Sequence, residues 1–509
     1  MGFNEELQKL ADDYNRAPES YAATAKLGLF LSTHTHTAEQ AMDILVKADS
    51  LARSREERVA VLNRLGQLAT IFKPRAAACA VYRELYQLFP DSLAVAQSYA
   101  NELDWNSQPE EAAQVIGKAT AQSLHYAVSI ARKQGTRPRQ LMFAPELLAA
   151  FGEIGDTLEA YLKGRRLGLL PDVEAIVPIG LGKVANRFLL DCWRRAAPEI
   201  TWIDDLEECR HLAESYRNQL LSAYWFPING EMVYRQDALI RFQRLWDEQG
   251  RPPIACLPDD VVERGHAWLR TLGVPADAWF VAVHIRDGGD RSLVADGLNR
   301  GRNGDVETAL PAIRRIVDAG GWVIRIGNRS TESLTGMPNV IDLTEQPRQD
   351  WQDIFLLTQC RFMMGSYSGP SSVSRSFAVP TVCFNIFPHK QIVGLRTRDI
   401  VVHKLLRRRD DGRLLSFDEM ASPEVLRLFH PKEIHDNGLE LVNNTSEDIT
   451  AAVEQMLRRL SRGDAAPEAE AALNTAYAAI RRRHGLETGA IIGGRFLSAH
   501  ADLFEDSRP

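Results

Sequence analysis

The chain contains 509 residues, of which 45% are hydrophobic and 25% charged. This length fits roughly three to four domains, and the composition is typical of a soluble globular protein. A net charge of −7 argues against a nucleic-acid-binding protein, which would usually carry a basic face. The six cysteines form no Cys-x-x-Cys pair and have no histidines at zinc spacing, so we expect reduced cysteines and no metal site. Because there is no signal-peptide pattern and no run of about 18 apolar residues, we predict a cytoplasmic protein without a transmembrane segment.

Residues 1–170 are rich in Ala, Leu and Glu, with apolar residues at helical spacing. Pro74-Arg-Ala-Ala-Ala78 lies 35 residues before Pro109-Glu-Glu-Ala-Ala113, and each stretch opens a helix with proline in its first turn. Weaker copies are Ala38–Ala41 and Gly152–Tyr161. A period near 34 resembles tetratricopeptide repeats, so we predict a helical repeat domain that binds a protein or mediates oligomerisation; a plain helical bundle is the alternative.

The next region, residues 171–275, is predicted to be an N-terminal Rossmann-like domain. A short buried strand, Glu174–Gly180, leads into a glycine turn with Gly180, Gly182 and Lys183, and a helix follows. The amino end of a helix after such a turn can receive an anion or a sugar. The spacing is not that of a Walker loop, and taken alone the turn is more typical of a structural feature.

Residues 276–509 are predicted to be a C-terminal Rossmann-like domain. Strands and helices alternate in this region, which indicates a parallel sheet with ligands at the carboxyl ends of its strands. The predicted strands are Trp279–Ile285, Trp322–Gly327, Val340–Asp342, Phe362–Gly365 and Val379–Phe384, and the predicted helices are Val306–Ala319, Trp351–Gln359 and one beginning at Val373.

Polar residues follow several of these strands at the point where each strand ends. The serine-rich loop offers hydroxyl groups, backbone N–H groups and the positive end of a helix dipole, which together suit a diphosphate. Arg286 can clamp the same diphosphate with its planar guanidinium group. The structural alternatives are an ion pair between Arg286 and Asp287, a core histidine at position 284, and serines that only cap their helix. The residues concerned are His284, Arg286, Asp287, Gly327, Asn328, Ser366, Ser368, Gly369, Ser371, Ser372 and Asn385.

Two other chemistries fit the motifs less well. A serine hydrolase needs a Gly-x-Ser-x-Gly elbow, but Gly365-Ser-Tyr-Ser-Gly369 places tyrosine at the nucleophile position. A dinucleotide enzyme needs Gly-x-Gly-x-x-Gly, and Ala185 stands where the third glycine after Gly180 and Gly182 belongs. Because alanine is an accepted variant at that position, the dinucleotide alternative is weakened and stays open.

The stretch from Arg251 to Pro388 resembles a family of bacterial glycosyltransferases through many short blocks in the same order. The His-x-Arg element is also similar to that of fucosyltransferase-type enzymes, which have two Rossmann-like domains in the GT-B arrangement. This chain departs from the family at Asn328, where Asp is common, and at Pro370, where Leu is common. The matching blocks are Gly250–Pro253, Ala278–Phe280, His284–Asp287, Arg302–Asp305, Pro311–Ile313, Gly320–Gly327, Val340–Asp342, Trp351–Leu356, Cys360–Phe362, Gly365–Gly369 and Pro380–Asn385.

The resemblance implies an α/β protein of GT-B type, with the two Rossmann-like domains preceded by the helical domain. It implies metal-independent transfer of a sugar from a nucleotide-diphosphate or CMP sugar to a glycan or protein acceptor, with no cofactor. A nucleotide-sugar epimerase and a non-catalytic repeat scaffold are the alternatives. The implied catalytic residues are Arg286, His284 and Asp287; the donor-binding residues are Arg302, Asn303, Gly327, Asn328, Ser366, Ser368, Gly369, Ser371, Ser372 and Asn385, with Gly180, Gly182 and Lys183 in the N-terminal glycine turn.

Overall fold

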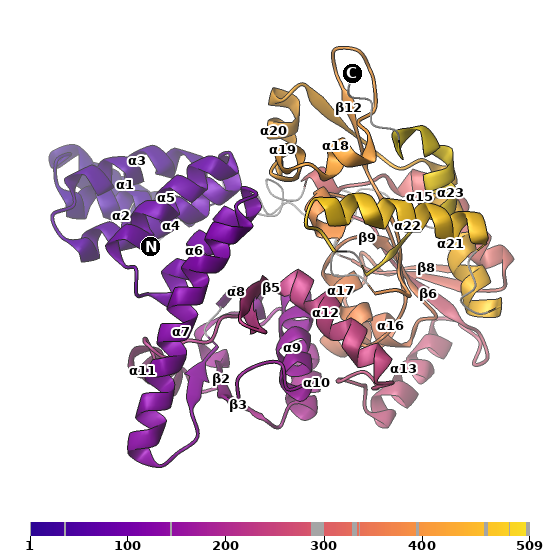
Figure 1. The fold of residues 1–509 in the computed structure, drawn as a ribbon, viewed down its shortest axis with the longest axis horizontal. Coiled ribbons are helices and arrows are strands. Elements are labelled where there is room, and N and C mark those ends of the chain that lie inside the picture. Colours follow the sequence, from indigo (N-terminus) through magenta and orange to yellow (C-terminus); the bar gives the residue numbers. More distant parts are fainter. Residues whose placement is uncertain are drawn as a thin grey trace.

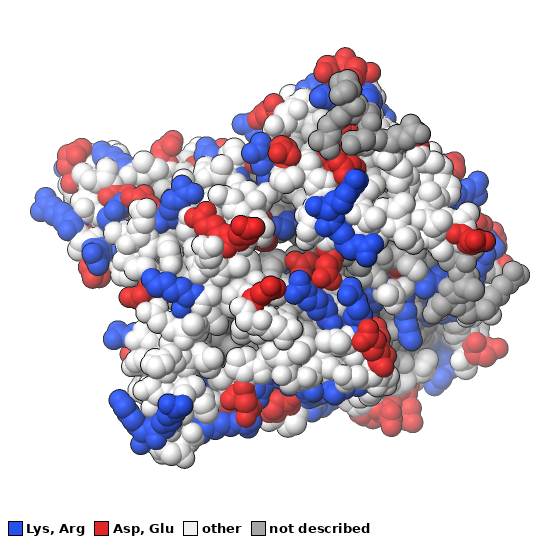
Figure 2. Space-filling view, viewed as in Figure 1, with Lys and Arg blue, Asp and Glu red and all other residues white. Residues whose placement is uncertain are grey.

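The computed structural model describes residues 2–34, 37–142, 145–286, 300–327, 333–334, 336–392, 396–462, 467–487 and 489–504. A helical domain is followed by a small and then a larger α/β domain, each built on a parallel sheet (Figure 1). The predicted fold class, an α/β protein with two parallel-sheet domains after a helical domain, is confirmed. On the face shown in Figure 2, basic and acidic side chains are interspersed and neither sign forms an extended area.

The helical domain consists of successive helix hairpins. Small residues let the paired helices approach: a Cβ at Gly28 would lie 2.9 Å from the Leu45 side chain, and one at Gly66 would lie 2.7 Å from the Tyr82 ring. The last helix is the longest and continues beside the second domain, where the Ser123 hydroxyl donates to the Leu220 carbonyl (2.6 Å). The helices are α1 (Phe3–Arg16), α2 (Tyr21–Ser32), α3 (Ala38–Leu51), α4 (Arg55–Phe72), α5 (Arg75–Leu88), α6 (Leu93–Trp105) and α7 (Pro109–Gln134).

The second domain has a three-stranded parallel sheet in the order β1-β2-β3. The stretch Gly152–Tyr161, expected as a further repeat copy, instead lies in α9, because Ile154 and Leu158 belong to the apolar core of the α/β domains. The elements are β1 (Arg139–Leu141), α8 (Pro145–Ala149), α9 (Phe151–Arg166), β2 (Glu174–Pro178), α10 (Arg187–Ala196), β3 (Ile200–Ile203), α11 (Leu206–Ser215), β4 (Trp225–Ile228), β5 (Glu231–Tyr234) and α12 (Arg235–Glu248). The division at residues 170 and 275 stays a prediction; β1 and α9 pack with the second domain although they precede residue 171.

The third domain has a seven-stranded parallel sheet in the order β14-β11-β10-β9-β6-β7-β8. Alternate residues of β6 point to opposite faces: Val281 and Val283 join the core under α15 and α21, whereas Phe280 and Ala282 join the core shared with α16 and the second domain. Its strands are β6 (Phe280–His284), β7 (Trp322–Arg325), β8 (Val340–Asp342), β9 (Met363–Ser366), β10 (Thr381–Ile386), β11 (Ile400–His403) and β14 (Ile491–Ile492). Its main helices are α13 (Asp259–Thr271), α15 (Val306–Asp318), α16 (Asp350–Gln359), α17 (Gly369–Ser376), α21 (Ser446–Arg462), α22 (Glu468–Arg483) and α23 (Gly494–Ala499).

A small insertion between β11 and α21 connects the third domain to the helical domain. The Arg75 guanidinium of α5 lies 4.5 Å from the centre of the Phe429 ring, and a His430 ring nitrogen lies 3.2 Å from the Thr70 carbonyl. The helical domain is therefore attached to the α/β part of the molecule at a second place besides α7. The insertion contains β12 (Leu405–Arg408), α18 (Phe417–Ala421), α19 (Pro423–Leu426), α20 (Pro431–Asp436) and β13 (Leu439–Val442).

Candidate functional site

The carboxyl ends of β6 and β9 bring four of the predicted site residues together. Gly365 pairs with His284 across the two strands, and a Cβ at position 365 would lie 1.9 Å from the His284 carbonyl oxygen. Only glycine fits this contact. Beyond it, the Arg286 backbone N–H donates to the Ser366 hydroxyl (3.2 Å), and the Ser368 hydroxyl lies 3.0 Å from Nδ1 of His284. The strand ends therefore hold the imidazole and the start of the arginine residue in fixed positions.

A short segment, Arg302–Gly304, lies across the same edge of the sheet. The Gly304 N–H donates to the Arg286 carbonyl (2.8 Å), and a Cβ at Gly304 would lie 2.6 Å from Nδ2 of Asn385. The Arg302 guanidinium lies 5.8 Å from the centre of the Tyr367 ring. Burial, and to a lesser extent the charge of Arg286, lowers the pKa of Arg302 to about 10, against the opposite effect of Tyr367. Two arginines thus concentrate positive charge at this edge, which favours an anionic ligand.

The serine hydroxyls that follow β9 are engaged within the protein. Besides the Ser366 and Ser368 contacts, Ser371 Oγ donates to the Ser368 carbonyl (2.7 Å), and Ser372 Oγ donates to Asp156 (3.1 Å). The four hydroxyls connect strand ends, cap α17 and join two domains, which is the structural alternative considered for the loop. The serines of this loop therefore position neighbouring groups of the protein.

Helix α9 of the second domain packs directly on the amino end of α17 (Figure 1). A Cβ at Gly152 would lie 2.9 Å from the Gly369 Cα and 3.3 Å from the Ser372 side chain. The first turn of α17 is therefore covered at Gly369 and Ser372.

This contact brings charged residues of the second domain close to the site. The sequence analysis did not predict these residues. Glu153 accepts from Arg235 (3.0 Å), and Asp156 lies 3.6 Å from the Arg375 guanidinium. Burial raises the pKa of Asp156, although Arg375 and Arg235 act in the opposite direction. The signal in the sequence is the pair of glycines, Gly152 and Gly155, on one face of a helix.

Of the other predicted residues, the glycine turn is not joined to this cluster, Gly327 lies beside it, and two residues lie outside the described ranges. A Cβ at Gly180 would lie 2.5 Å from the Asp204 carbonyl oxygen, so close packing accounts for this glycine. Among the described residues, no hydrogen bond or ion pair joins Gly180, Gly182 or Lys183 to the cluster at β6 and β9. Gly327 lies beside the His284 ring, and its carbonyl accepts from Arg348 (2.9 Å). Asp287 and Asn328 lie outside the described residues.

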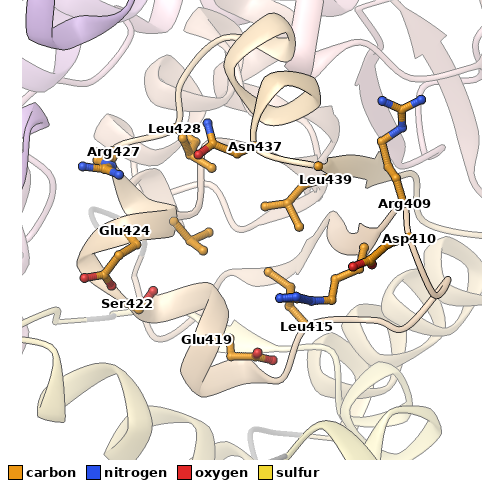
Figure 3. A pocket seen from close by; sticks show the side chains of 13 residues that line it. Arg409, Asp410, Leu415, Glu419, Ser422, Glu424, Arg427, Leu428, Asn437 and Leu439 are labelled. Carbon is orange, nitrogen blue, oxygen red and sulfur yellow. The ribbon is translucent and has the colours of Figure 1, made fainter. Parts of the chain in front are cut away.

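A groove of about 710 Å³ lies elsewhere, in the insertion, and contains none of the predicted site residues. Figure 3 shows Arg409 and Asp410 on one side of it and Ser422, Glu424 and Arg427 on the other. In the described parts of the chain, no three His, Cys, Asp or Glu side chains form a group that could hold a metal ion. None of the helices described is both long and apolar enough to cross a membrane.

No protein-family model and no curated protein matches the chain. Solved structures give partial likenesses. A glycosyl transferase of family 9 from Veillonella parvula is 12% identical over 52% of this chain and 85% of that chain, with a TM-score of 0.35. The E. coli ADP-heptose LPS heptosyltransferase II is 11% identical over 58% and 97%, with a TM-score of 0.32. An O-GlcNAc transferase from Thermobaculum terrenum is 15% identical over 95% and 98%, with a TM-score of 0.25. These three structures are glycosyltransferases; at such scores and identities the likenesses carry no argument about the activity of this chain.

Proposed function

We propose that the protein is a glycosyltransferase that moves a sugar from a nucleotide-sugar donor to a glycan or protein acceptor without a metal ion. The observation that carries this proposal is the cluster at the carboxyl ends of β6 and β9, where Ser368 fixes His284 and where Arg286 and Arg302 lie at one edge. In parallel α/β sheets ligands bind at this edge. Two guanidinium groups suit the two phosphates of a nucleoside diphosphate.

In the proposed reaction, the bond between the sugar and the donor phosphate breaks, and the phosphate leaves with the bonding electrons. Arg286 and Arg302 stabilise the negative charge that develops on the leaving group. A base takes the proton of the acceptor hydroxyl, whose oxygen forms the new bond to the sugar. His284 is our candidate for this base, because the contact of its Nδ1 with Ser368 fixes the ring; Asp287 is the second candidate.

The remaining predicted residues have supporting roles in this proposal. Asn303 and Asn385 line the donor side beside Gly304, and the Ser366–Ser372 loop holds the strand ends in register. We place the acceptor on the side of the second domain, whose Glu153 is close enough for its charge to raise the pKa of Arg302. The helical domain is proposed to bind a protein acceptor or partner, and the protein is proposed to act in the cytoplasm.

The test is a thermal-shift screen of the full chain against ADP, GDP, UDP, dTDP and CMP, repeated with Arg286→Ala. Arg210→Ala, on the exposed surface of α11, is the matched control. A nucleotide at 100 times its dissociation constant should stabilise the wild type and the control by about 2.7 kcal/mol, and should stabilise Arg286→Ala much less. Equal stabilisation of all three proteins, or none of the wild type, would refute the donor site. Transfer of a labelled sugar from a nucleotide-sugar donor to added glycans then distinguishes a transferase, which labels the glycan, from a non-catalytic scaffold, which does not.

A further inference from the structure

Lys404 is a buried cation that the sequence motifs did not single out. It follows β11 and is only 3% exposed. Its ammonium group donates to the Asn303 carbonyl (2.8 Å), and among the described residues this is its one hydrogen-bond partner. An ammonium group has three N–H donors and is seldom buried without a carboxylate partner. Two of its donors are therefore available beneath the segment Arg302–Gly304.

The groups around Lys404 do not neutralise its charge. The backbone carbonyl of Lys404 accepts from ring nitrogens of His389 (2.8 Å) and His403 (2.9 Å), which places a proton on each of those nitrogens. Burial lowers the pKa of Lys404 to about 8, although the charge of Asp305, with which it forms no ion pair, acts in the opposite direction. Arg481, from α22, acts on the same two histidines and adds further positive charge.

A second buried donor lies under the same segment. Nδ2 of Asn385 has no hydrogen-bond partner in the described structure, although Asn385 is only 1% exposed and its other side-chain atom accepts from the Asn444 N–H (2.8 Å). Gly304 passes directly over this Nδ2 atom. Unpaired buried donors are rare in folded proteins because each loses its hydration, and a ligand that accepts from them restores the balance.

We propose that Lys404 is a further binding residue of the donor site, where its ammonium holds the Arg302–Gly304 segment and attracts the negative charge of the donor phosphates. The identity of the ligand, a nucleotide-sugar donor, rests on the proposed function. The position of the positive charge rests on the geometry alone. Lys404 then forms, with Arg286 and Arg302, a set of three cations along the ends of β6 and β11.

The first test compares Lys404→Met with Lys432→Met, which removes an exposed lysine of α20. Isothermal titration calorimetry measures the affinity of each protein for three ligands. These are the nucleoside diphosphate that stabilises the wild type, the matching nucleoside, and inorganic pyrophosphate. We expect Lys404→Met to weaken the diphosphate and pyrophosphate about tenfold or more and to leave the nucleoside unchanged, since a charge-assisted contact is lost. Unchanged diphosphate binding, or an equal loss for the nucleoside, would overturn the proposal.

The second test uses the wild-type protein alone. Because the ammonium loses its proton near pH 8 in the free protein, the affinity of the wild type for the diphosphate should fall as the pH rises from about 7 to about 9.5. A flat profile contradicts the inference. If no nucleotide binds but pyrophosphate does so through Lys404, the anion site stands and the proposed donor is wrong. If pyrophosphate does not bind either, both ideas fail.

Discussion

The contact between α9 and α17 predicts that one added methyl group will destabilise the protein. In Gly152→Ala the new Cβ would lie 2.9 Å from the Gly369 Cα and 3.3 Å from the Ser372 side chain. Carbon atoms in contact normally lie about 3.5–4.0 Å apart, and a backbone Cα cannot rotate away. Overpacking of this kind costs about 1–3 kcal/mol. That cost outweighs the gain of up to about 1 kcal/mol that alanine brings to a helix interior, because position 152 lies in the first turn of α9.

Gly117→Ala is the matched control, because it makes the same change inside α7. There the new Cβ would meet only the flexible side chain of Met232, at 3.2 Å. We expect the control to keep or raise the melting temperature in a circular-dichroism scan, and Gly152→Ala to lower it by several degrees. Limited proteolysis should also cut Gly152→Ala faster between the two α/β domains. A melting temperature of Gly152→Ala equal to that of the control would refute the claim that the two helices are in rigid contact.

Two further predictions concern buried charges. Burial lowers the pKa of His389 from its ordinary 6.5 to about 4. Between these pH values the unfolded chain takes up a proton at this residue and the folded chain does not. The free energy of unfolding should therefore fall by about 3 kcal/mol as the pH is lowered from 6.5 to 4. His389→Gln keeps an N–H for the Lys404 carbonyl and should flatten that part of the melting-temperature profile, whereas parallel profiles would contradict this cause. Although burial raises the pKa of Glu159, Arg396 and Lys163 lower it overall, and Glu159→Gln leaves both cations buried without a carboxylate. We expect a loss of about 3–5 kcal/mol in urea unfolding relative to the exposed control Glu207→Gln; an unchanged midpoint would exclude a stabilising role for the cluster.

The serine-rich loop lies at the strand end where the sequence predicted it, but its hydroxyl groups contact other protein groups. Its hydroxyls hold His284, the Arg286 backbone and Asp156, so substitutions in the loop should move those groups. In the proposed donor site, the ligand is therefore expected to meet arginine and lysine side chains, while the serines hold the groups around it. It also explains why an assembly of small residues is needed at β9, where bulk would separate the strands or the domains.

The sequence by itself determined the helical hairpins and the strands of the third domain. Apolar periodicity and glycine turns are local signals, and they predicted β6, β7, β8, β9 and the parallel sheet. They also placed His284, Arg286, Ser366 and Ser368 at strand ends, because the end of a strand is visible in the chain where apolar alternation stops.

Only the tertiary structure decided which residues meet across the domains. Gly152 and Asp156 lie more than two hundred residues before Gly369 and Ser372, and nothing local connects them. The same holds for Lys404, whose ammonium reaches the Asn303 carbonyl from a different strand. Burial and charge compensation are properties of the packed molecule, since they depend on what surrounds a side chain in three dimensions. For this reason the sequence could mark the strand ends as a candidate binding site, whereas packing decided which charged side chains lie there.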